Sequence, residues 1–143
     1  MKSTIIFDLE GTLVDVGGDS LSRVFIEKRE LKQLETEYEL GIVTGATRAQ
    51  LEYVLQNTFL NKYFSTQNTV SKDECLEAKA TGKPFQILLD RGFSRPVVII
   101  GDSEGDKLGA KVIGVGFVRV DTSELMITND FSKYLKEATQ LLL

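Results

Sequence analysis

Short apolar runs alternate along the chain with stretches whose apolar positions recur every three or four residues. The runs at 4–7, 40–43, 97–100 and 116–120 have the length of strands, and a weaker candidate lies near 64–69. The run at 97–100 is apolar at every position, as expected for a central strand that is covered on both faces. Strands that alternate with helical patterns predict a parallel sheet between layers of helices.

Helical spacing fills the intervals between these runs. Apolar residues repeat at that spacing over 21–38 and over 47–59, where Thr47 is a suitable N-cap. Pro84 can begin a further helix, because its missing N–H is no loss in the first turn. A stripe of apolar residues over 131–142 predicts a last helix whose terminal leucines face the core. We therefore expect an α/β chain with a three-layer, Rossmann-like fold and a mostly parallel central sheet.

Size and composition narrow the possibilities. The 143 residues suffice for one domain with a real core but not for two, so we expect a single domain over residues 1–143. No segment approaches the roughly 18 apolar residues of a membrane span, and the start does not resemble a signal peptide, so we expect a cytoplasmic protein with no membrane partner.

Charge and residue types exclude several classes of function. A net charge of −4 argues against an extensive nucleic-acid surface, which would need a basic face. The chain has no histidine, so it has no Ser-His-Asp triad and no His-ligated zinc. The single cysteine, Cys75, allows neither a disulfide framework nor a thiolate metal cluster.

Polar residues stand just past three of the predicted strands. Asp8, Thr44 and Asp102 occupy these positions. In parallel sheets, ligands bind beyond the carboxyl ends of the strands, near the point where the strand order reverses. Three separate strands would therefore bring polar side chains to one edge of the sheet, which burial alone does not explain.

The first two motifs combine carboxylates with a hydroxyl. The segment FDLEGT places Asp8 and Glu10 at the end of the first strand. One carboxylate can attack phosphorus while the other handles the proton of the leaving group. In the segment IVTG, the Thr44 hydroxyl and the Gly45 N–H suit phosphoryl oxygens. Each motif taken alone also fits a strand-end turn with a helix cap.

The last two motifs add an ammonium group and a second acidic pair. In GKP, Pro84 favours an extended Lys83 at the start of a helix, where the ammonium could neutralise charge on the nucleophile and the phosphoryl group. In IIGDSEGD, Asp102 is placed to bind Mg²⁺ directly, and Asp106 could hold a metal-bound water or Lys83. A solvated lysine and an acidic helix N-terminus are the alternatives for each motif alone.

In this order the four motifs resemble those of the haloacid dehalogenase superfamily of phosphohydrolases, over nearly the whole chain. The resemblance implies an aspartyl-phosphate on Asp8. It implies that Asp8, the backbone carbonyl of Glu10 and Asp102 hold Mg²⁺, with Asp106 completing the acidic metal site. Thr44, with Gly45, and Lys83 would bind the phosphoryl group.

The chain departs from the family pattern in two respects. Glu10 stands where most of these phosphatases carry an aspartate as acid and base, although glutamate has a similar pKa, about 4.3 against 3.9. The intervals between motifs are too short for a substantial cap domain, and residues 14–38 should supply only a turn and a helix. The site should therefore be open, and a homodimer or a bulky substrate could complete it.

We thus expect a Mg²⁺-dependent phosphatase acting on a phosphorylated small molecule or macromolecule. The alternative is a binding or regulatory module of the same fold with little turnover. A phosphotransferase or a dehalogenase fits less well, because the first usually needs a cap and the second does not need the metal site. A response-regulator receiver is excluded by motif order, since Lys83-Pro84 precedes the acidic pair.

Overall fold

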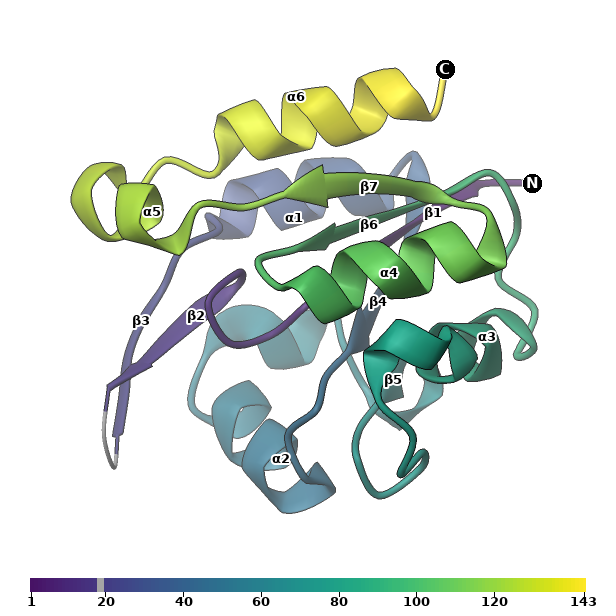
Figure 1. The fold of residues 1–143 in the computed structure, drawn as a ribbon. Helices are drawn as coiled ribbons and strands as arrows, with labels where there is room; N and C mark the ends of the chain where they lie inside the picture. The colour runs from purple at the N-terminus through teal and green to yellow at the C-terminus, as the bar shows by residue number, and fades with distance from the viewer. Residues whose placement is uncertain (18–19) are drawn as a thin grey trace.

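Five strands form a parallel sheet in the computed structural model, which describes residues 1–17 and 20–143 (Figure 1). The order across the sheet is β5-β4-β1-β6-β7, with β1 in the middle. The order reverses beside β1, which is where ligands bind in such sheets. The strands are β1 (Ser3–Phe7), β4 (Tyr38–Val43), β5 (Thr69–Val70), β6 (Val97–Gly101) and β7 (Gly116–Arg119).

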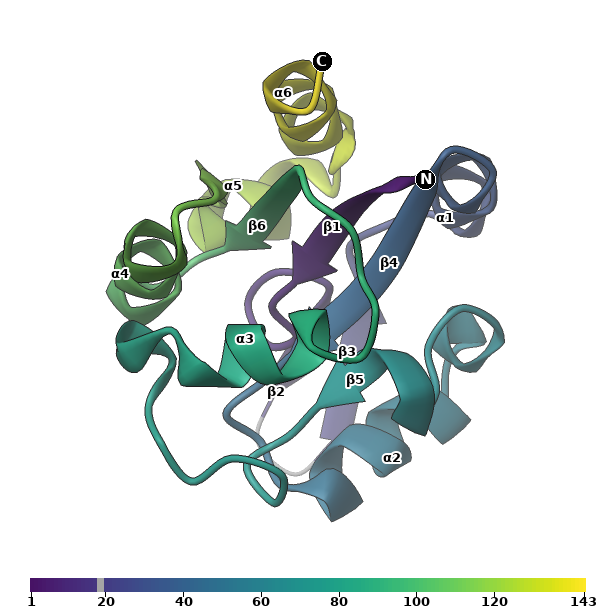
Figure 2. The same cartoon turned by 90° about the vertical axis from the view of Figure 1, so that its right-hand side faces the viewer.

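The sheet is covered on both faces by helices, which gives the expected three-layer α/β architecture (Figure 2). The helices α1, α2 and α6 pack on one face with α5, and α3 and α4 pack on the other. They are α1 (Lys28–Glu35), α2 (Arg48–Gln56), α3 (Lys83–Leu89), α4 (Glu104–Ile113), α5 (Thr122–Thr128) and α6 (Ser132–Leu141). Three short 3₁₀ helices connect them, η1 (Phe59–Lys62), η2 (Thr66–Asn68) and η3 (Lys79–Thr81).

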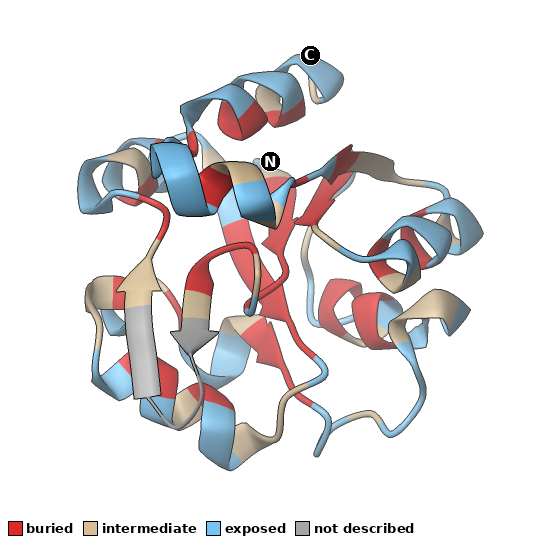
Figure 3. Ribbon diagram, turned by 60° about the vertical axis from the view of Figure 1, so that its left-hand side comes forward, coloured by how far each residue is buried: buried red, intermediate tan, exposed pale blue. Residues whose placement is uncertain are grey.

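The inner strands β1 and β6 are buried along most of their length, and Figure 3 shows buried residues in red. In β1, Ile5 and Phe7 face one core cluster and Ile6 faces the other. In β6, Val98 and Ile100 face the first cluster, and the residues between and before them face the second. The alternation of side chains along a strand therefore divides each apolar run between two cores, as the continuous run at 97–100 predicted.

Two expected helices begin where the sequence indicated. Thr47 caps α2, since its side chain accepts a hydrogen bond from the Gln50 N–H at 3.2 Å. Pro84 lies in the first turn of α3. The weak strand candidate near 64–69 is mostly wrong, because η2 occupies 66–68 and pairing with β4 begins only at Thr69.

The expected helix over 21–38 is wrong in its first part. Residues 20–24 form strand β3 (Ser20–Val24), which pairs antiparallel with β2 (Val14–Gly17), and α1 begins only at Lys28. In the sequence SLSRV the apolar residues Leu21 and Val24 are three positions apart, which is helical spacing, so the pattern itself gave no signal for a strand. The side chain of Leu21 lies outside the described part of the structure.

The end of the last helix is more exposed than the sequence predicted. Tyr134, Leu135 and Ala138 of α6 are buried, but Leu141 is 53% exposed. Only Leu142 of the terminal leucines packs against the core. Leu141 lies over Gly116, the first residue of β7. Because glycine has no side chain, Gly116 does not cover Leu141. The expectation that the terminal leucines face the core is therefore wrong for all but one.

The chain inserts little between its motifs. Between β1 and β4, the described residues form the β2–β3 hairpin and α1, and no separate cap domain. Within the described residues, no helix is both long and apolar enough to span a membrane. The carboxyl ends of β1, β4 and β6 are consequently not covered by any additional domain in this part of the chain.

Candidate active site

Asp8 leaves the carboxyl end of β1 and lies at the centre of a polar cluster. Its backbone N–H donates to the Ile100 carbonyl at 2.9 Å, which fixes its position beside β6. The residue is only 8% exposed. Its carboxylate accepts a hydrogen bond from Lys79 Nζ at 2.6 Å, and the Thr12 hydroxyl lies 3.5 Å from its other oxygen. Asp8 is therefore a buried carboxylate held directly against an ammonium group.

Lys79 belongs to η3, which precedes α3 and packs on α4. Its Nζ atom also donates to Asp106 Oδ1 at 2.9 Å. The side chain of Lys79 is 14% exposed, and that of Asp106 is fully buried. The close packing requires Gly109 in α4, because a Cβ there would overlap the Lys79 carbonyl oxygen. One lysine thus joins the carboxylates that follow β1 and β6.

Lys83 does not reach this cluster, which corrects the expectation for that residue. Its side chain is 61% exposed and its ammonium pairs with Glu77 at 2.9 Å. Lys83 begins α3, and Gly82 before it turns the chain with φ +79°. The turn directs Lys79 inward and leaves Lys83 at the surface. Lys79 has no neighbouring proline and lies in a 3₁₀ turn, so the sequence pattern gave no signal that favoured it.

Asp106 has both carboxylate oxygens engaged by protein groups. Oδ1 accepts from Lys79, and Oδ2 accepts from the Ser103 hydroxyl at 2.7 Å. Ser103 is the N-cap of α4, and its side chain accepts from the Asp106 N–H at 3.1 Å. This reciprocal pairing orients Asp106 toward Lys79 at the start of the helix. The expectation that Asp106 could hold Lys83 is wrong, because Asp106 binds Lys79 and Lys83 pairs with Glu77.

Burial dominates the electrostatics of the pair. It raises the pKa of Asp8 to about 8, with the charge of Asp106 and a contact with Asp102 adding to the effect, although Lys79 opposes it. Burial lowers the pKa of Lys79, but the charges of Asp8 and Asp106 outweigh burial and the net pKa is raised. The cluster therefore keeps a cationic Lys79, and a cation bound beside Asp8 would favour the ionised form of that carboxylate.

Three carboxylates in this cluster are close enough to hold a metal ion. Single oxygens of Asp8, Asp102 and Asp106 all lie within 4.8 Å of one another. A set made only of carboxylate oxygens suits Mg²⁺ or Ca²⁺ and not zinc. The side chain of Asp106 is fully buried, whereas Asp8 and Asp102 keep some exposure directly after β1 and β6, so these two carboxylates are the best placed for direct contact.

The segment after Asp8 turns sharply. Leu13 and Val14 both donate their N–H groups to the Leu9 carbonyl, and Gly11 N–H donates to the Val14 carbonyl at 2.8 Å. Gly11 has φ +80°, a conformation that favours glycine. The turn leaves Glu10 exposed at the rim of the site. Glycine at position 11 therefore allows the sharp exit from β1.

A cavity of about 440 Å³ opens beside Asp8. Thr44 lies at its wall directly after β4 and is 6% exposed, with its hydroxyl accepting from the Ala46 N–H at 3.1 Å. Its lining residues are Asp8, Glu10, Thr44, Gly45, Ala46, Gln50, Lys79 and Ser103. The structure thus brings the residues predicted from the first two motifs to one cavity, together with Lys79.

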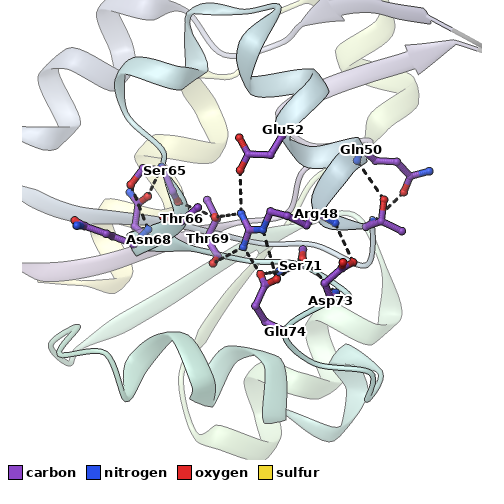
Figure 4. A network of polar contacts seen from close by, with 12 residues as sticks. Arg48, Gln50, Glu52, Ser65, Thr66, Asn68, Thr69, Ser71, Asp73 and Glu74 are labelled. Carbon is purple, nitrogen blue, oxygen red and sulfur yellow. Dashed lines mark hydrogen bonds and ion pairs between the residues drawn. The ribbon is translucent and has the colours of Figure 1, made fainter.

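Two arginines, Arg48 and Arg23, have structural partners within the protein. The guanidinium of Arg48 donates to the Thr69 hydroxyl at 2.7 Å and forms an ion pair with Glu74, as Figure 4 shows. Arg23 donates to the Met126 carbonyl at 2.6 Å. Arg48 therefore fastens α2 to the loop after β5, which leads toward Lys79.

Comparison with known proteins points to one family. A family model described as haloacid dehalogenase-like hydrolase matches residues 27–120, more than half of the chain. The match includes Thr44, Lys79 and the acidic residues that follow β6, and it begins after Asp8. No curated protein matches the chain in sequence.

Solved structures share the fold at low sequence identity. A Thermotoga maritima protein assigned as a beta-phosphoglucomutase is 14% identical with a TM-score of 0.72, over 98% of this chain and 100% of that one. A Lactobacillus plantarum protein assigned as a phosphoglycolate phosphatase is 19% identical with a TM-score of 0.67, over 82% and 86%. A Bacteroides thetaiotaomicron enzyme of the same family, in a magnesium complex, is 13% identical with a TM-score of 0.67, over 85% and 94%.

Proposed function

Because this chain belongs to the haloacid dehalogenase-like hydrolase family, we propose that it is a Mg²⁺-dependent phosphatase that hydrolyses a phosphomonoester through an aspartyl-phosphate on Asp8. The observation that carries the proposal is the position of Asp8. It is a buried carboxylate at the centre of the sheet edge, it contacts Lys79 at 2.6 Å, and it lines the cavity. The proposed nucleophile therefore lies beside both a cationic side chain and a cavity that can hold a substrate.

The acidic cluster fits a hard divalent cation. Asp8, Asp102 and the backbone carbonyl of Glu10 would hold Mg²⁺, which keeps several waters and prefers oxygen ligands. When bound, the ion polarises the phosphoryl oxygens and offsets the charge that develops on them. Asp106 would support the site indirectly. Its two carboxylate oxygens accept hydrogen bonds from Lys79 and from the Ser103 hydroxyl, and the first of these bonds orients Lys79.

The protein groups can carry the reaction in two displacements. In the first, an Asp8 oxygen bonds to phosphorus, the bond to the leaving oxygen breaks, and Glu10 gives that oxygen a proton. In the second, water attacks phosphorus, Glu10 takes the water proton, and the bond between Asp8 and phosphorus breaks. Glu10 suits this role because it lies at the exposed rim of the cavity, where a leaving group would be.

Three further groups would bind the transferred phosphoryl group. The Thr44 hydroxyl and the Gly45 N–H border the cavity beside Asp8, and the Lys79 ammonium lies on the other side. Donors fixed before the reaction stabilise charge that develops in the transition state. We assign to Lys79 the role that the sequence suggested for Lys83.

The proposed substrate is a phosphorylated small molecule or macromolecule. The open cavity sets no upper limit on the size of the leaving group, and the related structures include proteins assigned as a phosphatase and as a phosphoglucomutase. The absence of a cap in the described residues favours hydrolysis over mutase chemistry, because a mutase must keep its intermediate away from water. A homodimer that covers the cavity, and a cytoplasmic location, remain part of the proposal.

The test compares hydrolysis of p-nitrophenyl phosphate by wild type and Asp8→Asn, each with Mg²⁺ and with EDTA. Asp90→Asn is the matched control, since Asp90 is exposed and its side chain accepts only from Gln86 at 2.8 Å among the described contacts. We expect Mg²⁺-dependent turnover in wild type and in Asp90→Asn and none in Asp8→Asn. Turnover that persists in Asp8→Asn would refute the nucleophile assignment.

Absent turnover in every variant requires a second measurement. Mass spectrometry after acid quenching then detects a phosphorylated Asp8 in wild type treated with acetyl phosphate. A stable phosphorylated form would support the binding or regulatory module in place of the phosphatase. The Glu10→Gln variant further separates the phosphatase from the regulatory module. If Glu10 is the acid and base, this variant should slow both the phosphorylation of Asp8 and the hydrolysis of the phosphorylated form.

A further inference from the structure

Thr122 connects two loops of the site that are distant in sequence. It is the first residue of α5, directly after β7 and the capping residue Asp121. Its hydroxyl donates to the Gly11 carbonyl at 2.7 Å, and the same oxygen lies 3.3 Å from Asp102 Oδ2. The fourth-motif carboxylate and the turn after Asp8 thus meet at one side chain that belongs to none of the four motifs.

The space around this contact is closed by the backbone of Gly11. A Cβ at Gly11 would overlap the Asp102 carboxylate and lie 3.1 Å from the Thr122 hydroxyl oxygen. The carboxylate of Asp102 therefore rests against bare backbone on one side and against the Thr122 hydroxyl on another. Its position is set by close packing as well as by hydrogen bonding.

The start of α5 is itself held firmly. Asp121 caps the helix by accepting from the Glu124 N–H at 3.1 Å, and its own N–H donates to the Tyr134 hydroxyl at 3.1 Å. Leu125 is fully buried in the core. Arg23 ties the middle of the helix to β3 through the Met126 carbonyl. These contacts leave the Thr122 hydroxyl little freedom to move away from Asp102.

We propose that Thr122 is a positioning residue for the metal ligand Asp102, and this rests on the proposed function. A hydroxyl has a single proton, which Thr122 shares as a donor between the Gly11 carbonyl at 2.7 Å and Asp102 Oδ2 at 3.3 Å. The bond to Gly11 fixes the peptide next to Glu10 and holds the hydroxyl against Asp102 Oδ2. The carboxylate can then offer its other oxygen to a cation shared with Asp8. Groups behind a metal ligand orient it in this way and tune its affinity.

The test measures Mg²⁺ affinity directly by isothermal titration calorimetry. Thr122→Val keeps the shape of the side chain and removes its hydroxyl, and Thr122→Ser keeps the hydroxyl. Thr128→Val is the matched control in the same helix, because the Thr128 hydroxyl donates to the Glu124 carbonyl and to no group of the site. We expect Thr122→Val to weaken Mg²⁺ binding about tenfold, whereas the other two variants bind as wild type does.

Kinetics give a second readout that a purely structural role would not change. In Thr122→Val, the Mg²⁺ concentration for half-maximal hydrolysis should rise by the same factor as the dissociation constant, while KM for p-nitrophenyl phosphate at saturating Mg²⁺ stays constant. Circular dichroism and thermal unfolding of each variant identify any loss of fold. If Thr122→Val does not fold, a failure of Thr122→Ser to keep wild-type affinity would overturn the proposal.

The outcomes separate this inference from the proposed function. Mg²⁺ binding by Thr122→Val that equals wild type refutes the role of Thr122 and leaves the phosphatase untouched. Loss of affinity in Thr128→Val as large as in Thr122→Val also refutes it, since the effect would then belong to the helix. A wild type that binds no Mg²⁺ refutes both.

Discussion

Lys79 Nζ lies 2.6 Å from Asp8 Oδ1, although 71 positions separate the two residues in the chain. The same ammonium reaches Asp106 at 2.9 Å. A buried lysine with two carboxylate partners cannot be removed without leaving negative charge uncompensated. This pairing makes Lys79 the structural centre of the candidate site, whereas Lys83 contacts only Glu77 at the surface.

Replacing each lysine by methionine tests this distinction. We expect Lys79→Met to lower kcat for p-nitrophenyl phosphate by about 10²–10³, because a fixed cationic donor to the phosphoryl group is lost. Lys83→Met should retain nearly full activity and stability, since an ion pair that is exposed to solvent contributes little to stability. Steady-state kinetics of both variants at saturating Mg²⁺ provide the measurement. A large loss with Lys83→Met and none with Lys79→Met would restore the assignment made from sequence.

Gly11 should tolerate no side chain, for two separable reasons. Its φ of +80° strains any L residue by about 1–2 kcal/mol, and its Cβ would also overlap the Asp102 carboxylate. Gly114 has φ +74° with open space around it, so Gly114→Ala carries the strain alone. We expect both alanine variants to unfold at lower urea concentration, and only Gly11→Ala to lose Mg²⁺ binding as well. Equal Mg²⁺ affinity in the two variants would contradict the steric argument.

The sequence was most informative where one physical rule controlled the outcome. Asp8, Thr44 and Asp102 could be placed because parallel strands end at one edge of a sheet, and the apolar run at 97–100 identified a central strand. The order of motifs also identified the family that the comparison supports. These inferences depend on local pattern and on sheet topology, which a single sequence reveals.

Other features depended on contacts between distant segments. Lys79 and Lys83 are separated by one short turn, and the turn at Gly82 together with the packing of η3 on Gly109 directs Lys79 inward. Thr122 lies outside every motif, and its contact with Gly11 arises from the placement of α5. Periodicity missed the strand at 20–24, because its two apolar residues are three positions apart, as in a helix, and only the pairing with β2 makes the segment a strand.

Arg48 should matter for stability more than for the chemical step. Its guanidinium donates to the hydroxyl and the carbonyl of Thr69 and pairs with Glu74, which in turn accepts from the Ser71 N–H at 2.8 Å. Hydrogen bonds to charged groups contribute about 1.5–3 kcal/mol each. We expect Arg48→Met to lower the free energy of unfolding in urea by at least about 2 kcal/mol.

A surface arginine supplies the control for this prediction. Arg29 pairs with Glu27, but its side chain is 83% exposed, so Arg29→Met should leave the free energy of unfolding nearly unchanged. KM for p-nitrophenyl phosphate should stay unchanged in both variants if Arg48 does not contact the substrate. A selective rise of KM in Arg48→Met, with unchanged stability, would instead identify Arg48 as a substrate ligand.

The raised pKa of Asp8 predicts how the metal-free protein responds to pH. Burial raises this pKa from 3.8 to about 8 in the folded state, so the folded protein binds a proton more tightly than the unfolded chain does. The resulting stabilisation is complete below about pH 3.8 and is lost as the pH rises through about 8. In EDTA, we therefore expect the free energy of unfolding in urea to fall between pH 6 and pH 9.

Asp8→Asn isolates this effect, because asparagine cannot titrate and the remaining groups are common to both proteins. The chain has no histidine, so few other groups change charge in this range. The decrease between pH 6 and pH 9 should be smaller in Asp8→Asn than in wild type. A bound cation favours the ionised carboxylate, so Mg²⁺ should stabilise wild type more at pH 9 than at pH 6. Equal slopes in EDTA would mean that Asp8 is already ionised in the folded, metal-free protein, with Lys79 outweighing burial.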